Sequence, residues 1–280
     1  SPGTVIISAV GEVQDITKIV SPNLKKIINS EILYIGMTKN LTLAGSALFQ
    51  TLGKIGGELA ETFDSNYIKK VFSTVQTLIK NNKILAGHDI SSGGLITSIL
   101  EMNFPNTDYG LKIDTLGFQE KDLIKIMFNE SPGILIQVDS NIAKELTDSN
   151  LHVIKLGNPI KDRSLIITHR DSHITLNIDY LRDSWYKTSH LLDNHQTELK
   201  YSVERFNNYK NQPLKYVFPK NFTGKISDLN IYSNTKTYRN KIKAAVIREK
   251  GINSEREMAY MLHIAGFDVK DVHMTDIVNG

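Results

Sequence analysis

The stretch KDLIKIMFNESPGILIQVDSNIAKEL, Lys121–Leu146, predicts in succession a helix, a glycine turn, a strand and a second helix. Gly133 marks the turn, because glycine tolerates backbone conformations that interrupt regular structure. The run that follows it, ILIQV, is mostly apolar, which is typical of a strand buried in a sheet. A strand between two helices is the unit from which α/β folds are built. The stretch therefore places the chain in the α/β class.

The segment before this stretch carries the same two patterns. Apolar, β-branched runs at Thr4–Val10 and Glu31–Met37 predict buried strands. Between them, Ser21–Ile28 predicts a short helix, with its serine as cap and a proline in its first turn. Ala44–Gly56 and Asn66–Asn82 have apolar residues at helical spacing, and the second carries an apolar stripe typical of a helix packed on a sheet.

The remainder of this region adds one helix and three strands. Gly94–Phe104 predicts the helix, and short strands are predicted at His152–Ile160, Ser164–Arg170 and His173–Leu181. We therefore expect one α/β domain over Ser1–Leu181, which is a reasonable size for a single hydrophobic core.

Beyond this domain the character of the sequence changes twice. Residues 182–240 are polar and aromatic and contain the only tryptophan, so we expect a helix and then an extended linker that packs on other surfaces. Residues 241–280 predict a strand, a capped amphipathic helix and a second strand. A parallel sheet needs helices on both faces, which this segment cannot supply. We therefore expect a second, truncated domain, and a chain cut at both ends.

The composition limits the kinds of protein that this chain can be. Hydrophobic residues make up 40% and charged residues 22% of its 280 residues, which suits a globular protein. A net charge of +3 gives no support to nucleic-acid binding. The absence of cysteine excludes disulfides, thiolate metal sites and a cysteine nucleophile within the chain. No apolar run approaches the roughly 18 residues of a membrane span, so we expect a cytoplasmic protein without membrane contact.

The stretch GHDISSGGL, Gly87–Leu95, carries chemistry suited to a ligand site. Asp89 offers a hard oxygen ligand to Mg²⁺, and Ser91 or Ser92 offers a hydroxyl and a backbone N–H group to a phosphate. Paired glycines allow close approach of the backbone, and the free N–H groups of the following helix start favour an anion. The alternative is an ordinary helix start, in which Ser92 caps the helix and Asp89 binds local amides. Residue spacing alone does not decide between them.

Other polar residues give weaker indications. A Ser-His-Asp hydrolase could use Ser46 or Ser91, but the sequence has no G-x-S-x-G elbow. His88 and the residue after it point in opposite directions if the chain is extended, so His88 is interpreted as structural. Glu130 lies at a predicted helix-to-strand turn, where a carboxylate usually faces solvent or binds amides. His273 ends a predicted strand, and a single histidine there only suggests a ligand.

Four stretches resemble one protein family, in the order in which that family carries them. LAGHDISSGGLITSILEM, Leu85–Met102, resembles the H-D-x-S-D-G-G-L…E-M signature of the phosphoribosylformylglycinamidine synthase family. LAGSALFQTLGKIGGELAETFD, Leu43–Asp64, resembles its L-G-G-S-A-L segment, and YLRDSWYKTSHLLD, Tyr180–Asp193, its L-R-x-x-W-x-x-T-S segment. AAVIREKGINSEREMAYMLHIAGFDVKDVHMTDIVNG, Ala244–Gly280, resembles the start of its fused glutaminase domain.

The resemblance implies a domain arrangement and a site. Residues 1–181 would form the C-terminal-type α/β domain of the aminoimidazole ribonucleotide synthetase superfamily. Residues 182–240 would form a packed linker, and residues 241–280 the first strand, helix and strand of a flavodoxin-like class I glutaminase domain. By position in the family motif, Asp89 would be a Mg²⁺ ligand and Ser91 would contact ATP or ADP.

The chain departs from the family pattern at two places. Ser92 stands where the family has a second aspartate, and Ala44 stands where it has the first glycine of a pair. Neither change removes the metal carboxylate. The resemblance suggests that this motif serves the structural one of two related nucleotide sites. The glutaminase Cys, His and Glu are expected outside the chain, so we assign it no catalytic residue.

The resemblance also implies an activity for a full-length synthase. Formylglycinamide ribonucleotide, ATP and glutamine would be converted to formylglycinamidine ribonucleotide, ADP, phosphate and glutamate, with the remaining domains of the same chain as partners. We expect the 280 residues alone to be inactive. Two alternatives stay open: a Mg-nucleotide-binding module without turnover, and another ATP-dependent enzyme of the same superfamily. The glutaminase-like segment argues against the second alternative.

Overall fold

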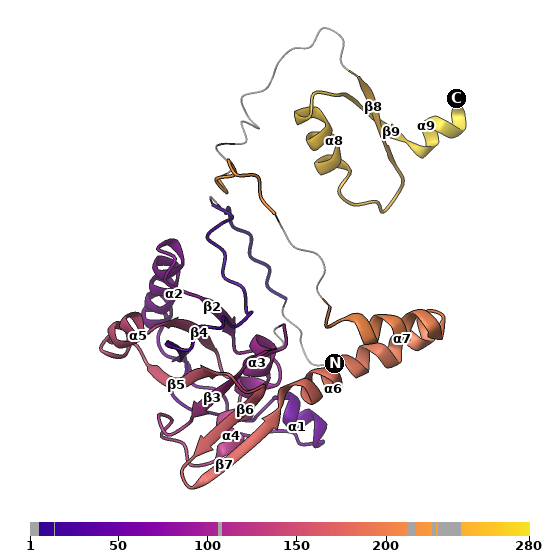
Figure 1. The fold of residues 1–280 in the computed structure, drawn as a ribbon. Helices are drawn as coiled ribbons and strands as arrows, with labels where there is room; N and C mark the ends of the chain where they lie inside the picture. Colours follow the sequence, from indigo (N-terminus) through magenta and orange to yellow (C-terminus); the bar gives the residue numbers. More distant parts are fainter. Residues whose placement is uncertain (1–5, 14, 106–107, 212–216, 226–227, 229–241) are drawn as a thin grey trace. The chain divides into compact units, whose positions relative to one another are not determined.

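A computed structural model of the chain describes residues 6–13, 15–105, 108–211, 217–225, 228 and 242–280 (Figure 1). The chain divides into two compact units. One unit is Lys18–Val217, and the other combines Ser1–Thr17 with Phe218–Gly280. The domain limits expected from the sequence, at residues 181 and 240, stay predictions.

The unit Lys18–Val217 is built on one seven-stranded sheet in the order β2-β4-β1-β5-β3-β6-β7. Only β3 and β6 pair in parallel, and the other neighbouring strands pair antiparallel. The strands are β1 (Ser30–Gly36), β2 (Ala86–Asp89), β3 (Gly110–Asp114), β4 (Gly133–Asp139), β5 (Val153–Ile160), β6 (Ser164–His169) and β7 (Ser172–Asn177). The strands expected at 31–37, 152–160 and 164–170 are thus confirmed to within a residue or so. The strand expected at 173–181 is confirmed only as far as Asn177, because residues 178–181 belong to a helix.

The interior strand β1 is buried on both faces, because its alternating residues enter two separate cores. Leu33 and Ile35 pack in the core under α2 (Ser65–Lys80) and α5 (Ser140–Thr147). Ile32 and its next-but-one neighbour, Tyr34, pack in the opposite core. That second core lies under α3 (Gly94–Asn103) and α4 (Leu123–Phe128). Helices therefore cover both faces of the sheet, and the α/β class is confirmed.

The stretch Lys121–Leu146 folds as predicted into α4, a turn, β4 and α5. The junction between β4 and α5 is set by Asp139, whose carboxylate accepts hydrogen bonds from the amides of Asn141 (2.9 Å) and Ile142 (3.1 Å). A carboxylate at this position satisfies amides that have no partner within the helix. The predicted helix at 66–82 is confirmed as α2, and the one at 94–104 as α3. The predicted helix at 44–56 is shorter, because α1 spans only Ala47–Thr51.

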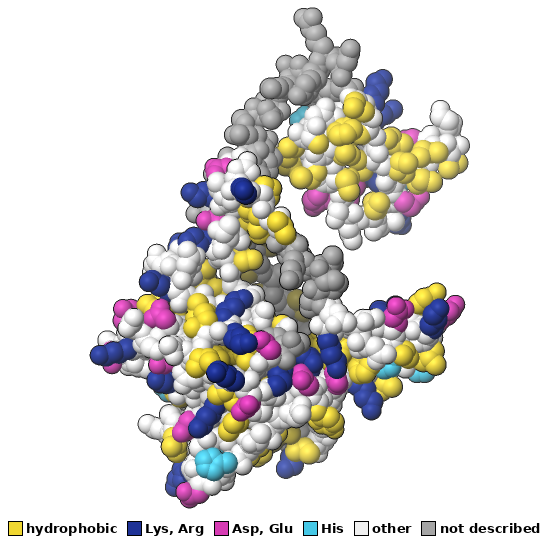
Figure 2. Space-filling model, in the orientation of Figure 1, with side chains coloured by type: hydrophobic (Ala, Val, Ile, Leu, Met, Phe, Trp, Pro, Cys, Tyr) yellow, Lys and Arg dark blue, Asp and Glu magenta, His cyan; other side chains and the backbone are white. Residues whose placement is uncertain are grey.

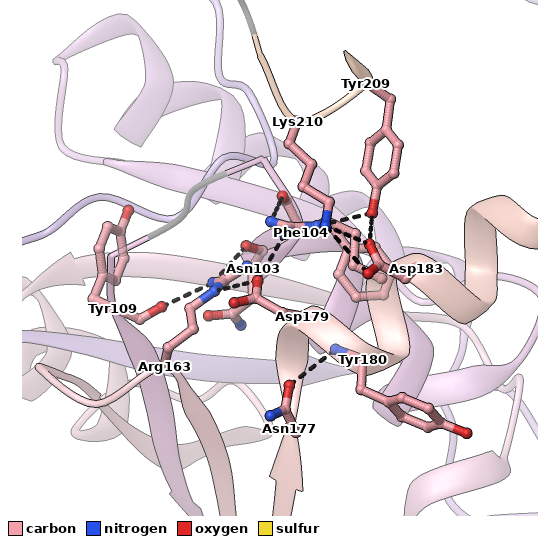
Figure 3. Close-up of polar contacts among 11 residues, drawn as sticks. Asn103, Phe104, Tyr109, Arg163, Asn177, Asp179, Tyr180, Asp183, Tyr209 and Lys210 are labelled. Atoms are coloured by element: carbon pink, nitrogen blue, oxygen red, sulfur yellow. Dashed lines mark hydrogen bonds and ion pairs between the residues drawn. The ribbon is translucent and has the colours of Figure 1, made fainter. Parts of the chain in front are cut away.

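Two helices follow β7, where the sequence predicted one helix and an extended linker. They are α6 (Ile178–Gln196) and α7 (Leu199–Asn208). The first begins within the segment predicted as a strand, because Asn177 caps it by accepting a hydrogen bond from the Tyr180 amide (2.9 Å; Figure 3). Both helices belong to the same compact unit as the sheet. Among the described residues, no helix combines the length and the apolar character needed to cross a membrane.

The prediction of a helix at Ser21–Ile28 is wrong. Gln137 of β4 is fully buried, and its amide both donates to the Lys25 carbonyl (2.8 Å) and accepts from the Lys25 amide (2.7 Å). The Leu24 amide donates to the Met102 carbonyl (3.0 Å). These tertiary partners take backbone groups that a helix would pair internally, so the segment forms no helix.

Replacing Gln137 with leucine keeps the size of the side chain but removes both partners of the Lys25 backbone. We expect Gln137→Leu to lower the free energy of unfolding by about 1–2 kcal/mol, because two backbone groups lose their hydrogen bonds. Urea unfolding measures this value. Exposed Gln119→Leu is the matched control. Equal stability of the two variants would show that the bonds to Lys25 do not hold the segment.

The prediction of a strand at Thr4–Val10 is also wrong for Ile6–Val10, the part of it that the structure describes. Ile6–Val10 lies in neither a helix nor a strand, and its apolar side chains are exposed. An apolar run becomes a strand only when a neighbouring strand pairs with its backbone, and none of the described residues does so here. Residues 1–5 lie outside the described residues.

The other unit contains the predicted strand, helix and strand. β8 (Lys243–Arg248) and β9 (Asp268–His273) pair in parallel, with α8 (Glu255–Ile264) between them and α9 (Met274–Asn279) after them. Parallel pairing through a helical crossover is the unit of a parallel sheet, so this prediction is confirmed. No side chain caps α8, contrary to expectation. Apolar side chains gather on the surface of this unit (Figure 2), among them Ile247, Met258, Tyr260, Met261 and Val278.

Candidate functional site

Asp89 ends β2, the strand at one edge of the sheet. The next residue, Ile90, is buried and donates its amide to the Gly133 carbonyl (2.9 Å), which fixes the course of the chain after the strand. The carboxylate of Asp89 is 77% exposed and accepts no backbone amide among the described residues. The alternative in which Asp89 binds local amides is therefore wrong. A fixed backbone carries a carboxylate that faces solvent.

Ser91 and Ser92 follow at the surface, with Ser91 partly buried and Ser92 exposed. Neither hydroxyl makes a hydrogen bond within the described part of the chain. The residue that caps α3 is Gly93, with φ 88°, and no side chain caps this helix. The proposed cap by Ser92 is therefore wrong. Both hydroxyls are available to a ligand.

Gly93 and Gly94 both need to be glycine, because their φ angles of 88° and 75° lie in the left-handed region. Space excludes a side chain as well. A Cβ on Gly94 would lie 2.6 Å from the Asn129 carbonyl oxygen, and a Cβ on Gly93 would overlap the Thr97 side chain. The glycine pair therefore lets α3 begin directly against the turn that follows α4.

Glu130 joins this turn to a second loop. Its Oε1 accepts hydrogen bonds from the Gly93 amide (2.7 Å) and from the Ala47 amide (2.8 Å) at the start of α1. The Gly94 amide donates to the Ser91 carbonyl (2.9 Å). The amides of Gly93, which caps α3, and of Gly94, the first residue of α3, thus have partners, so the expectation that helix-start amides are free for an anion is wrong for these two. A phosphate here would meet the serine hydroxyls.

His88 bridges β2 and α3, as the structural interpretation expected. Its Nδ1 lies 2.7 Å from the Asp89 carbonyl oxygen, and its Nε2 lies 3.1 Å from Oε2 of Glu101. Its side chain is mostly buried, whereas that of Asp89 faces solvent. His88 Nδ1 nevertheless lies only 3.4 Å from Oδ1 of Asp89, so the two side chains approach each other, and the expectation that they point in opposite directions is wrong.

The other candidates from the sequence have structural roles. The Ser46 hydroxyl donates to the Leu43 carbonyl (2.7 Å) and accepts from the Phe49 amide (3.3 Å), so it caps α1. His273 caps α9, with Nδ1 accepting from the Thr275 amide (3.2 Å), and belongs to the other unit. Neither arrangement resembles a nucleophile beside a base.

Two family models match the chain. The model of the AIR synthase related protein, C-terminal domain, matches residues 32–151, and the model of the CobB/CobQ-like glutamine amidotransferase domain matches residues 241–280. A probable phosphoribosylformylglycinamidine synthase, chloroplastic/mitochondrial, of Arabidopsis thaliana is 34% identical over 100% of this chain and 20% of its own length. The phosphoribosylformylglycinamidine synthase of Homo sapiens is 30% identical over 100% of this chain and 21% of its own length. The chain is related to the phosphoribosylformylglycinamidine synthases.

The relationship to the synthases has a defined extent. The chain spans about a fifth of the length of the curated synthases that it matches. Among solved structures, a Thermotoga maritima PurL complexed with FGAR covers 59% of this chain, with 12% identity and a TM-score of 0.48. The two family matches confirm an AIR-synthase-type C-terminal domain followed by the beginning of a glutamine amidotransferase domain.

The residues around Asp89 suit magnesium with a nucleotide only in part. Mg²⁺ prefers oxygen ligands, keeps several waters, and is usually held by one or two carboxylates together with phosphates. Asp89, exposed and without an amide partner, fits such a role. Among the described residues there is no group of three His, Cys, Asp or Glu side chains that could hold a metal. The remaining ligands would come from phosphate, water or other parts of a synthase.

The sequence did not predict that Glu130 links two loops of the site. Glu130 was expected to face solvent or to bind amides, and it binds the amides of two loops that resemble separate synthase motifs. Gly93 and Ala47 are 46 positions apart in the chain (93 − 47), so no local pattern predicts that one carboxylate links them. The only local signal is a glutamate directly after a helix and just before a Ser-Pro-Gly turn.

Proposed function

We propose that the chain is part of an ATP-dependent phosphoribosylformylglycinamidine synthase. Such an enzyme would convert formylglycinamide ribonucleotide, ATP and glutamine to formylglycinamidine ribonucleotide, ADP, phosphate and glutamate. The observation that carries the proposal is the order of the two domain types, with the AIR-synthase-type match at 32–151 and the amidotransferase match at 241–280. Synthase relatives that are 30–34% identical align along the whole chain. The remaining domains of a synthase are the proposed partners.

In this proposal Asp89 and Ser91 form one wall of a Mg-nucleotide site for ATP or ADP. Bound Mg²⁺ would neutralise charge on the nucleotide phosphates. Asp89 presents its carboxylate to solvent from a fixed strand end, which lowers the entropy lost on binding. Ser91 and Ser92 supply hydroxyl donors to phosphate oxygens, while Glu130 keeps the glycine turn in place. The site takes its opposite wall from other domains, and so we infer that the chain alone has no turnover.

The proposal disfavours one alternative for the site and retains another. Another ATP-dependent enzyme of the superfamily is disfavoured by the amidotransferase match at 241–280. A structural rather than catalytic nucleotide site remains part of the proposal, because no catalytic residue is assigned to the chain. Cytoplasmic location stays a prediction, and one relative carries the words chloroplastic/mitochondrial in its name.

Glutamine-dependent turnover by a full-length synthase that carries this segment tests the proposal. We expect the wild type to form the amidine product, and Asp89→Ala to lose at least about tenfold in kcat/KM, since one charged contact to Mg-nucleotide is lost. Asp148→Ala, an exposed aspartate at the end of α5, is the control and should be unaffected. Wild-type rates in Asp89→Ala would remove Asp89 from the site, and turnover by the 280-residue chain alone would contradict its proposed incompleteness.

A further inference from the structure

A pocket of about 610 Å³ lies in the unit Lys18–Val217, and neither Asp89 nor Ser91 is among the residues that line it. Its volume is within the range of small-molecule sites. Its lining comes from the segment before β1, the end of β2, the end of α3 with the two residues after it, α6, and the two residues after α7. The lining residues are Asn23, His88, Glu101, Phe104, Pro105, Arg182, Trp185, Tyr186, Tyr209 and Lys210.

Aromatic rings make up one continuous wall of this Trp185 pocket. The ring centroids of Phe104 and Trp185 are 5.8 Å apart, and those of Trp185 and Tyr186 are 4.8 Å apart. Tyr186 in turn stacks on Tyr209 at 3.9 Å. Trp185 is 50% exposed, so part of its ring is free to stack against a ligand. Stacked aromatic walls bind flat rings well.

The two cations of the pocket are held by carboxylates from α6. The Arg182 guanidinium, with a side chain 4% exposed, lies 2.8 Å from Oδ1 of Asp179 and donates to the Phe104 carbonyl. Lys210 donates to Asp183 (3.2 Å; Figure 3). Because both cations are already paired with carboxylates, the pocket does not need an anionic ligand to balance its charge.

Tyr209 is held by the same carboxylate, Asp183, that pairs with Lys210. Its hydroxyl donates to Asp183 (Figure 3). Burial, followed by this bond to a carboxylate, raises the pKa of Tyr209 to about 12. The phenol therefore stays neutral, and its ring is a fixed part of the wall.

Two oxygen acceptors lie beside the aromatic wall. The Glu101 side chain is 26% exposed, and its Oε2 lies 3.1 Å from Nε2 of His88. The amide oxygen of Asn23 is buried and has no hydrogen-bond partner among the described residues. A buried acceptor without a partner is unfavourable, and a donor from a ligand would satisfy it.

The pocket also brings together two stretches that resemble synthase motifs. His88 and Glu101 come from the H-D…E-M stretch, and Arg182 and Trp185 come from the L-R-x-x-W stretch. The Mg-nucleotide proposal uses none of these four residues. They are 81 positions apart at the nearest (182 − 101), and they converge on one cavity.

We propose that the Trp185 pocket binds a flat heteroaromatic ring that carries an amino group, the chemistry of an aminopurine base. The ring stacks on Trp185, and the amino group donates to Glu101, with Asn23 as a second acceptor. The inference does not rest on the proposed function, because it involves neither Asp89 nor Ser91 and needs no metal or phosphate.

Trp185 is the only tryptophan of the chain, so its fluorescence reports on this pocket alone. The 280-residue chain is titrated with adenosine, without Mg²⁺ and with a chelator present. We expect saturable quenching of Trp185 emission by adenosine and, at the same concentrations, binding at least about tenfold weaker for inosine, in which a carbonyl replaces the amino group. A parallel titration with AMP shows whether the pocket binds the nucleotide or the nucleoside more tightly.

Glu101→Gln tests the acceptor, and Glu145→Gln on the exposed face of α5 is its matched control. We expect Glu101→Gln to weaken adenosine binding about tenfold and Glu145→Gln to leave it unchanged. Circular dichroism checks that both variants fold, and if Glu101→Gln does not, the adenosine-to-inosine ratio of the wild type decides. Absence of saturable quenching, or equal affinity for both nucleosides, would overturn the inference. Because Mg²⁺ is absent, neither outcome bears on the Mg-nucleotide site.

Discussion

Gly94→Ala is expected to lower the free energy of unfolding of the unit Lys18–Val217 by about 3–5 kcal/mol. At φ 75° an alanine is strained in any surroundings. A Cβ at this position would also lie 2.6 Å from the carbonyl oxygen of Asn129, 2.7 Å from the carbonyl carbon of Phe128 and 2.9 Å from the carbonyl oxygen of Met127. These are backbone atoms, so the turn after α4 would have to move. Urea unfolding gives the free energy directly.

The matched control separates backbone strain from steric overlap. Gly53 also has a positive φ, 64°, but a Cβ there would meet nothing within 4 Å. Gly53→Ala is therefore expected to cost only about 1 kcal/mol. If Gly94→Ala were no more destabilising than Gly53→Ala, the close contact between α3 and the α4 turn would be absent in solution.

Glu130→Ala is the second large effect, with an expected loss of about 2–4 kcal/mol in the free energy of unfolding. The substitution removes the acceptor of two backbone amides, those of Gly93 and Ala47, in different loops. Glu130→Gln keeps an oxygen acceptor without its charge, so it should lose only about 1 kcal/mol. Urea unfolding measures both variants.

Exposed Glu145→Ala controls for the removal of a surface carboxylate and should change stability by less than about 0.5 kcal/mol. Hydrogen exchange of the two loops adds a local measure. In Glu130→Ala we expect faster exchange at Gly93 and Ala47, because both amides lose their acceptor. Unchanged exchange at both amides would refute the role of Glu130 as the link between the loops.

Elements with a strong local pattern could be predicted from the sequence. The helix α2 follows from apolar residues at helical spacing, and β4 follows from an apolar run after a glycine turn. The strand β1 was predicted to be buried, and it is buried on both faces because its alternating residues enter two cores. In each case the period of the local sequence agrees with the packing that the tertiary structure provides.

Elements decided by distant partners could not be predicted. Ser21–Ile28 has a helical pattern, but Gln137, 112 residues from Lys25, takes its backbone groups. Ile6–Val10 has a strand pattern without a paired strand. The same limit applies to the site. The roles of Asp89 and Ser91 were predicted from the motif resemblance. The hydrogen bonds that Glu130 accepts from the Gly93 and Ala47 amides appear only when the two loops are placed in space.

The central claim is that Asp89 contributes to a site for magnesium with a nucleotide. Its most direct test is the magnesium and adenine-nucleotide content of a purified full-length synthase that carries this segment. We predict that Asp89→Ala loses bound magnesium and nucleotide relative to the wild type, whereas Asp148→Ala retains both. Equal content in all three proteins would contradict the account.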